Sequence, residues 1–178
     1  ENVKRLKEVA QAEDTSVISH RNRMAGFLER AQQIKTEWTA EDMEAMAFHL
    51  YKEMKSYTQA QTLINKNGWK VEPKLTPEMR KMIDLLREVA GQRTEQISTV
   101  YEETTNNIFE KVENYFPLKY EKEFNLISSE TIEQNRYRTT QAFKGFTFER
   151  KPKVKKVPRT DLFNVLEEAI SEQEWYIN

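Results

Sequence analysis

Apolar residues recur at helical spacing over the first 114 residues of this chain, and the regularity ends at the turn-like run 114–117. Within residues 3–35 the spacing is close to seven residues. One row contains Val3, Ala10, Val17, Met24 and Ala31. Such a row predicts one long amphipathic helix, or two helices that meet near residues 13–16. The polar residues Glu13 and His20 interrupt a second row, which argues against an uninterrupted coiled coil.

A second long helix is predicted to follow Thr39. Thr39 and Asp42 have the spacing of a capping box, with Asp in place of the usual Glu or Gln. The apolar residues between Met43 and Ile64 then fit a single helical face. Gly68 supplies a stop signal, because glycine readily adopts the left-handed conformation that ends a helix.

A third long helix is predicted to begin at Pro77. Thr76 is a suitable capping hydroxyl, and proline is favoured at the first helical position. The apolar face continues to Val112, although Gly91 weakens it. Pro117 disfavours helix in the residue before it, so this helix should end by residue 116.

The chain changes character after this point. We expect a short helix over 129–143, a brief strand over 146–149 and an extended basic arm over 151–158. Asp161 is predicted to cap a final helix, whose apolar face contains Leu162, Val165, Leu166, Ala169 and Ile170. The sequence therefore predicts a mostly α-helical protein: an elongated bundle of three long helices over 1–114, and a C-terminal subdomain over 115–178 with a turn, the arm and the terminal helix.

Charge is nearly balanced overall but uneven along the chain. The formal net charge is -1. Residues 136–159 nevertheless contain a single acid, Glu149, and nine basic residues: Arg136, Arg138, Lys144, Arg150, Lys151, Lys153, Lys155, Lys156 and Arg159. Interleaved phenylalanines in this basic tract would suit contacts with phosphates and stacking on bases. The competing interpretation is an arm that lies against acidic helices or against another protein.

No recognisable catalytic or metal-binding constellation appears in the sequence. Cysteine is absent, which excludes disulfides and thiolate chemistry. The only histidines, His20 and His49, have no second ligand at metal-binding spacing, so a structural or surface role is favoured for both. No cofactor is expected, because the four glycines are isolated and build no phosphate loop.

The methionines of the second and third predicted helices leave two interpretations open. Core packing is favoured, but flexible methionine side chains also suit an adaptable partner groove. The five residues concerned are Met43, Met46, Met54, Met79 and Met82.

The order of these signals resembles a helical segment found within very large tailed-bacteriophage polypeptides, the polyvalent or virion-packaged proteins. The resemblance covers residues 36–178. It is carried by the Thr39 helix start, the Asn67–Gly68 stop, the run Leu75-Thr76-Pro77-Glu78, the phrase from Val112 to Leu118 and the closing Glu174-Trp175-Tyr176-Ile177-Asn178. It differs from the family's pattern after Pro117, where Leu118-Lys119 stands in place of a basic or histidine residue.

The resemblance implies a non-enzymatic structural or connector module of a virion-associated polypeptide that is packaged or ejected with the genome. Its partners would be other domains or copies of virion proteins. Oligomers are possible, and no apolar run approaches the length of a membrane span. Tyr115, Phe116 and Pro117 are expected to lock the last long helix to the C-terminal part. The chain opens with Glu1, so we expect a processed product or a piece of something larger. The alternative function is nucleic-acid binding by the basic tract.

Overall fold

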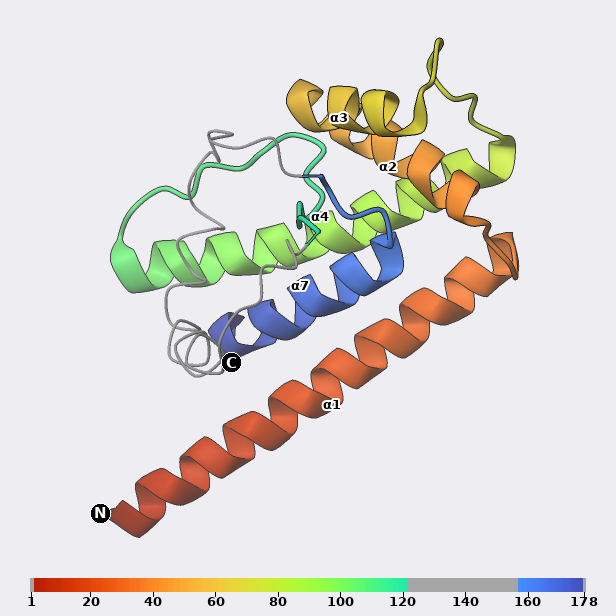
Figure 1. Cartoon of the computed structure of the whole chain (residues 1–178). Helices are drawn as coiled ribbons and strands as arrows, with labels where there is room; N and C mark the ends of the chain where they lie inside the picture. Colours follow the sequence, from red (N-terminus) through yellow and green to blue (C-terminus); the bar gives the residue numbers. More distant parts are fainter. Residues whose placement is uncertain (1, 122–156, 178) are drawn as a thin grey trace, which may run out of the picture.

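The computed structural model describes residues 2–121 and 157–177, which form a mostly helical structure (Figure 1). The five helices of this part are α1 (Asn2–Ile34), α2 (Ala40–Glu53), α3 (Tyr57–Asn67), α4 (Pro77–Thr105) and α7 (Leu162–Ile177). The mostly α-helical class is thereby confirmed. The bundle of three long helices with a basic arm is not confirmed, since the second predicted helix is divided and the arm lies largely outside the described residues.

Helix α1 is one uninterrupted helix, so the one-helix interpretation of its sequence is the correct one. Met24, Phe27 and Ala31 are buried against the rest of the molecule. Val17, from the same seven-residue row as Met24, is 60% exposed. Figure 1 shows the reason, because the N-terminal part of α1 continues past the end of α7.

The predicted second helix is in fact two helices, α2 and α3, which pack against each other. Lys55 has a positive φ of 61°, a left-handed conformation that ends α2. The backbone N–H of Ser56 then donates to the Tyr51 carbonyl over 2.8 Å, which closes the turn. The predicted capping box at the start of α2 is confirmed, since Thr39 Oγ1 accepts from the Asp42 N–H and the Asp42 carboxylate accepts from the Thr39 N–H.

Helix α4 begins as predicted and ends earlier. Thr76 Oγ1 accepts a hydrogen bond from the Met79 N–H over 3.2 Å. The helix stops at Asn106, whose φ of 55° is left-handed. Ile108 and Val112, which continue the apolar periodicity in the sequence, are exposed and lie beyond the helix.

Helix α7 lies against both α1 and α4 and completes the core. Its predicted apolar face is confirmed, because all five residues of that face are buried. Phe27 of α1 meets Phe163 of α7 edge to face, with ring centroids 5.5 Å apart. Met46, Met79 and Met82 are buried in this core, and Met43 and Met54 pack against it. The core-packing interpretation of the methionines is therefore supported.

An irregular segment follows α4 and returns to the start of α7. Phe116 is fully buried in the hydrophobic cluster that also contains Leu162 and Leu166. Tyr120 and Pro158 form an antiparallel β-bridge. The predicted helix over 129–143, the predicted strand over 146–149 and most of the predicted arm over 151–158 lie outside the described residues.

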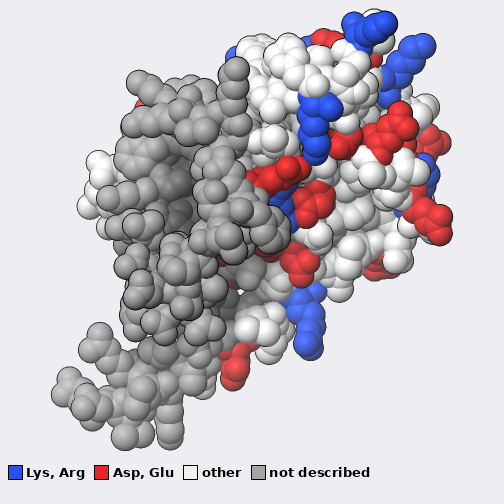
Figure 2. Space-filling view, viewed as in Figure 1, with Lys and Arg blue, Asp and Glu red and all other residues white. Residues whose placement is uncertain are grey.

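The described surface mixes charges of both signs. Figure 2 shows basic and acidic side chains interspersed on the described part of one face. Within the described ranges, no helix has the length and apolarity needed to cross a lipid bilayer.

Candidate functional site

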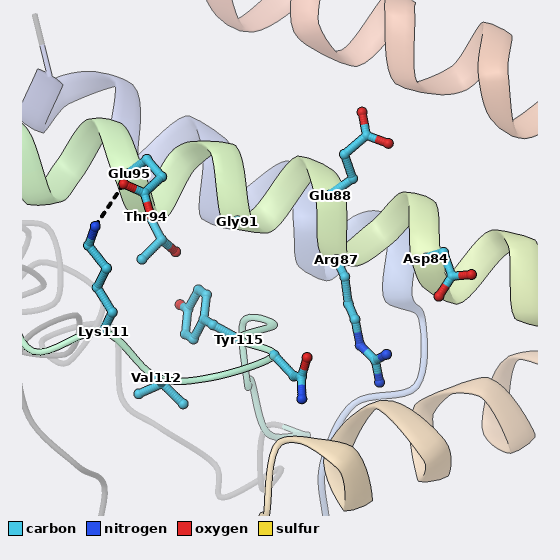
Figure 3. Close-up of a pocket in the computed structure, with 10 residues that line it drawn as sticks. Asp84, Arg87, Glu88, Gly91, Thr94, Glu95, Lys111, Val112 and Tyr115 are labelled. Atoms are coloured by element: carbon cyan, nitrogen blue, oxygen red, sulfur yellow. Dashed lines mark hydrogen bonds and ion pairs between the residues drawn. The ribbon is translucent and has the colours of Figure 1, made fainter.

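A groove lined mostly by polar residues lies between α4 and residues 111–115 (Figure 3). Its volume is about 460 Å³. One wall is a single face of α4, because its lining residues follow helical spacing from Asp84 to Glu95. The other wall is the segment that contains Lys111, Val112 and Tyr115. The sequence did not suggest this groove, since its second wall exists only because the chain folds back after Asn106.

The floor of the groove is open at Gly91. A Cβ atom built on this glycine would meet no heavy atom within 4 Å. The Tyr115 side chain lies on the opposite wall in Figure 3. The groove therefore joins a bare stretch of helix backbone to an aromatic ring, a combination that suits close approach of a flat or elongated group.

The charges that line the groove are paired with one another, with a neighbouring residue of α4 or with other helices. Lys111 Nζ donates to Glu95 Oε2 over 2.7 Å. Arg30 of α1 donates to both Glu88 carboxylate oxygens, at 2.8 and 2.7 Å. The hydrogen bond from Arg30 lowers the pKa of Glu88, so this carboxylate stays ionised and is a weak base.

Glu53 of α2 connects two arginines of α4. Its carboxylate accepts from Arg80 over 2.7 Å and also pairs with Arg87. Burial lowers the pKa of the Arg87 guanidinium, whose Nε atom has no hydrogen-bond partner among the described residues. Glu53 therefore links the C-terminal end of α2 to α4, which forms one wall of the groove.

A second polar feature is a buried ion cluster where α1, α4 and α7 meet. Arg93 of α4 is 1% exposed and Glu174 of α7 is 2% exposed. Arg93 Nη2 lies 2.9 Å from Glu174 Oε1, and Arg23 Nε of α1 lies 3.1 Å from the same oxygen. Burial lowers the pKa of Arg93 to about 10, so the guanidinium is still charged at neutral pH. The cluster couples three helices through one carboxylate.

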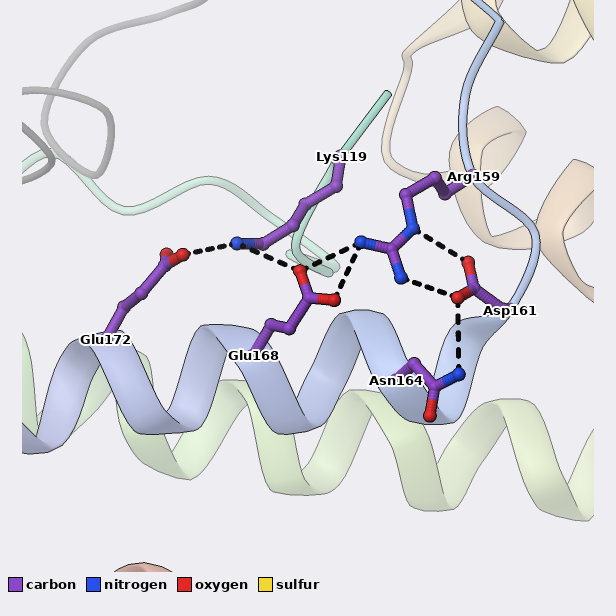
Figure 4. A network of polar contacts seen from close by, with 6 residues as sticks. All are labelled: Lys119, Arg159, Asp161, Asn164, Glu168 and Glu172. Atoms are coloured by element: carbon purple, nitrogen blue, oxygen red, sulfur yellow. Dashed lines mark hydrogen bonds and ion pairs between the residues drawn. The ribbon is translucent and has the colours of Figure 1, made fainter. Parts of the chain in front are cut away.

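A third polar network surrounds the start of α7 (Figure 4). Arg159 donates to Asp161 through Nε and Nη2, at 2.9 and 2.5 Å, and to both Glu168 oxygens through Nη1 at 2.8 Å. Lys119 Nζ pairs with Glu172 at 2.5 Å. The hydrogen bonds from Arg159 lower the pKa of Asp161. The network fastens the bridge between Tyr120 and Pro158 onto α7.

Asp161 immediately precedes α7, as the sequence predicted. Its backbone carbonyl accepts from the Val165 N–H over 3.0 Å. Its carboxylate accepts from Arg159 and from Asn164 Nδ2, the latter over 3.3 Å.

Of the nine basic-tract residues, only Arg159 falls within the described ranges. The other eight, Arg136, Arg138, Lys144, Arg150, Lys151, Lys153, Lys155 and Lys156, lie outside them. The Arg159 guanidinium is already bound by two carboxylates, so a phosphate would have to compete with Asp161 and Glu168. The basic-tract prediction therefore stays a prediction.

The turn residues Tyr115, Phe116 and Pro117 lie between the groove and the core. The Phe116 N–H lies 3.3 Å from Met54 Sδ, and Asn114 Nδ2 donates to the Glu53 carbonyl over 3.4 Å. The turn thus contacts the end of α2, while Phe116 reaches the core beside α7.

The two histidines lie apart. His49 Nε2 is 2.7 Å from the Pro73 carbonyl oxygen, to which its N–H donates. His20 Nε2 lies 4.0 Å from Glu167 Oε1. Within the described ranges, no cluster of three or more His, Cys, Asp or Glu side chains is arranged to bind a metal ion.

Sequence reasoning missed the buried ion cluster, although the sequence carried a signal for it. Arg93 stands three residues after Ala90 and four before Ile97, and both of those residues are on the apolar face of α4. A charged residue at an apolar position indicates a buried partner.

No family model, curated protein or solved structure matches this chain.

Proposed function

We propose that this chain is a structural connector module of a virion-associated bacteriophage polypeptide and acts by packing its helices against other proteins. The phage assignment comes from the sequence resemblance over residues 36–178. The mode of action comes from the geometry of α1.

The outer face of α1 is the observation that carries this proposal. Val17 and Ile18 are 60% and 59% exposed, and Leu28 is 45% exposed. These side chains lie on a helix of 33 residues, about 50 Å long at 1.5 Å per residue. Exposed apolar side chains along one rigid helix are suited to helix-to-helix packing with another protein.

The arrangement of the polar residues also supports a structural role. Glu88, Glu95 and Arg159 each bind an opposite charge within the chain. Such pairs fix the spacing of helices and segments. Arg30 with Glu88 joins α1 to α4, and Arg159 with Glu168 joins the bridge to α7.

The test is the protein content of purified phage particles from a genome that encodes this sequence. Quantitative mass spectrometry should find peptides of this chain in particles at a fixed ratio to a major structural protein. Cross-links from α1 to another protein chain in those particles are also expected. Presence in infected-cell lysate but absence from particles would overturn the proposal.

Nucleic-acid binding is the second candidate, and the uneven charge of residues 136–159 is the observation that favours it. Phosphate contacts release counterions, so affinity for DNA or RNA should fall steeply as salt rises. Fluorescence anisotropy with a labelled oligonucleotide between 20 and 300 mM NaCl, on the order of one decade of salt, measures this slope. Failure of the chain to bind either nucleic acid at the lowest salt would exclude this candidate.

A further inference from the structure

The outer face of α1 carries two charges of opposite sign, placed so that each would meet the other if a second copy of the helix ran in the opposite direction. Six residues follow helical spacing on this face, and all six are exposed: Asp14, Val17, Ile18, Arg21, Ala25 and Leu28. Asp14 and Arg21 flank Val17 and Ile18 at equal separations, and these two are the most exposed of the large apolar side chains described in α1. Neither charged side chain forms an ion pair with any residue whose side chain the structure describes.

We propose that the partner of this face is a second copy of the chain, with the two α1 helices packed antiparallel about a two-fold axis midway between Val17 and Ile18. The inference rests on the proposed connector function and names the partner of the same surface. The axis places Val17 opposite Ile18 of the second copy and Asp14 opposite its Arg21. Symmetry repeats both contacts, so one self-complementary patch supplies two apolar layers and two ion pairs.

The charge pattern selects this orientation over a parallel one. A parallel pair in the same register would place Asp14 against Asp14 and Arg21 against Arg21. Like charges at such positions repel, whereas the antiparallel pair alternates opposite charges around an apolar centre. Oppositely charged pairs beside the apolar layers also fix the register.

The fold leaves room for this pairing. Met24, Phe27 and Ala31 direct α1 onto α4 and α7, and Arg30 pairs with Glu88 of α4. Ile18 and Ala25 lie on the side of α1 away from those contacts. Val17 shares a seven-residue row with Met24, and it is exposed because the N-terminal part of α1 continues past the end of α7. Figure 1 shows that the N-terminal half of α1 projects from the rest of the described chain, so it is free to lie along the α1 helix of a second copy.

Light scattering on the purified full chain over a concentration series gives the first readout. The wild-type chain should be a dimer at high concentration. Ile18→Glu should weaken the dimer by roughly tenfold or more, because it places a carboxylate in the apolar centre. Gln33→Glu adds the same charge at an exposed position off the face and should leave the dimer unchanged. Unchanged circular dichroism and melting temperature will show that Ile18→Glu is folded.

Charge exchange tests the register. Asp14→Arg and Arg21→Asp should each weaken the dimer roughly fivefold, since each creates like-charge contacts across the axis. The double variant should recover most of the wild-type affinity. Singles that leave affinity unchanged, or a double variant weaker than both singles, would overturn the register.

A distance measurement tests the orientation. The chain has no cysteine, so Gln33→Cys accepts a single spin label. The antiparallel dimer should give an interspin distance of about 46 Å from a 1.5 Å rise per residue, while a parallel dimer would keep the labels within about 20 Å. A monomer at every concentration, or the short distance, would overturn the proposal. The chain could be monomeric while its Ile18→Glu variant is still lost from phage particles. That result would refute a second copy as the partner of this face and leave the connector function standing.

Discussion

Arg93 Nη2 lies 2.9 Å from Glu174 Oε1, and these two almost fully buried side chains connect the middle of α4 to the end of α7. Arg23 brings a second guanidinium from α1 to the same carboxylate. Arg93 Nε and Nη2 and Arg23 Nε make no hydrogen bond in the described part of the chain. The two guanidinium contacts with Glu174 are therefore ion pairs rather than aligned hydrogen bonds, and both depend on this one negative charge. Ser19 Oγ also donates to Glu174 Oε1 over 3.4 Å.

Glu174→Gln should lower the free energy of unfolding by about 3–5 kcal/mol, because it leaves buried guanidinium charge uncompensated. Urea denaturation followed by circular dichroism measures the change. Glu167→Gln is the matched control on the same helix. Glu167 is half exposed and 4.0 Å from His20, so its loss should cost under about 1 kcal/mol. Equal costs for the two variants would contradict the role assigned to the cluster.

Gly91→Ala should stabilise the protein by about 0.5–1 kcal/mol. Glycine weakens a helix interior, and the space above Gly91 is open, so alanine adds helix propensity without a clash. Thermal melting measures the gain. Gly68→Ala is the opposite control, because Gly68 has a φ of 63° and alanine is strained there. Destabilisation by Gly91→Ala would indicate a neighbour over the groove floor.

Phe116→Ala should cost about 3–5 kcal/mol, as expected for removal of a fully buried aromatic ring. The loss tests whether the turn after α4 is bound into the core. Ile108→Ala, in the same irregular segment, should change stability by less than about 0.5 kcal/mol, because Ile108 is 87% exposed. The difference in denaturation midpoint between the two variants is the measurement.

Stability should decline above pH 10 in a way that depends on Tyr51. Burial raises the pKa of its phenol above the ordinary value of 10.0, and its O–H donates to the Arg159 carbonyl over 2.7 Å. The folded state holds this proton more tightly than the unfolded state does. The resulting stability is complete below pH 10 and is lost as pH rises toward the folded pKa.

Tyr51→Phe should therefore flatten the fall in melting temperature between about pH 9 and pH 11, although it costs about 1–3 kcal/mol at neutral pH by removing the hydrogen bond. Exposed Tyr57 provides the control, since Tyr57→Phe should retain the wild-type slope. An unchanged slope in Tyr51→Phe would show that other groups govern the alkaline loss.

The helices that follow one apolar period were predictable from the sequence, and the interruptions were not. α1, most of α4 and α7 follow from apolar spacing and from the start signals at Thr76 and Asp161. The division between α2 and α3 was not predicted, because the residues from Met43 to Ile64 fit one helical face even though the chain turns at Lys55. The left-handed residue of that turn is Lys55 rather than a glycine, so the sequence contains no glycine to mark the end of α2.

The polar features were less predictable, because each joins residues far apart in the chain. Glu88 and Arg30 are 58 positions apart, and Lys119 and Glu172 are 53 apart. Their sequence neighbours are ordinary charged residues of amphipathic helices. Only Arg93, which interrupts an apolar face, gave a local sign of its distant partner.

Because α7 supplies Leu162, Val165, Leu166 and Ile170 to a core shared with α1 and α4, that core stays incomplete during synthesis long after α4 has been made. At about 5–20 residues per second, several seconds separate emergence of α4 from emergence of α7 on the ribosome. During that interval the nascent chain displays the apolar surface that α7 later covers. Chaperone demand for this protein should therefore be greatest just before α7 emerges from the ribosome.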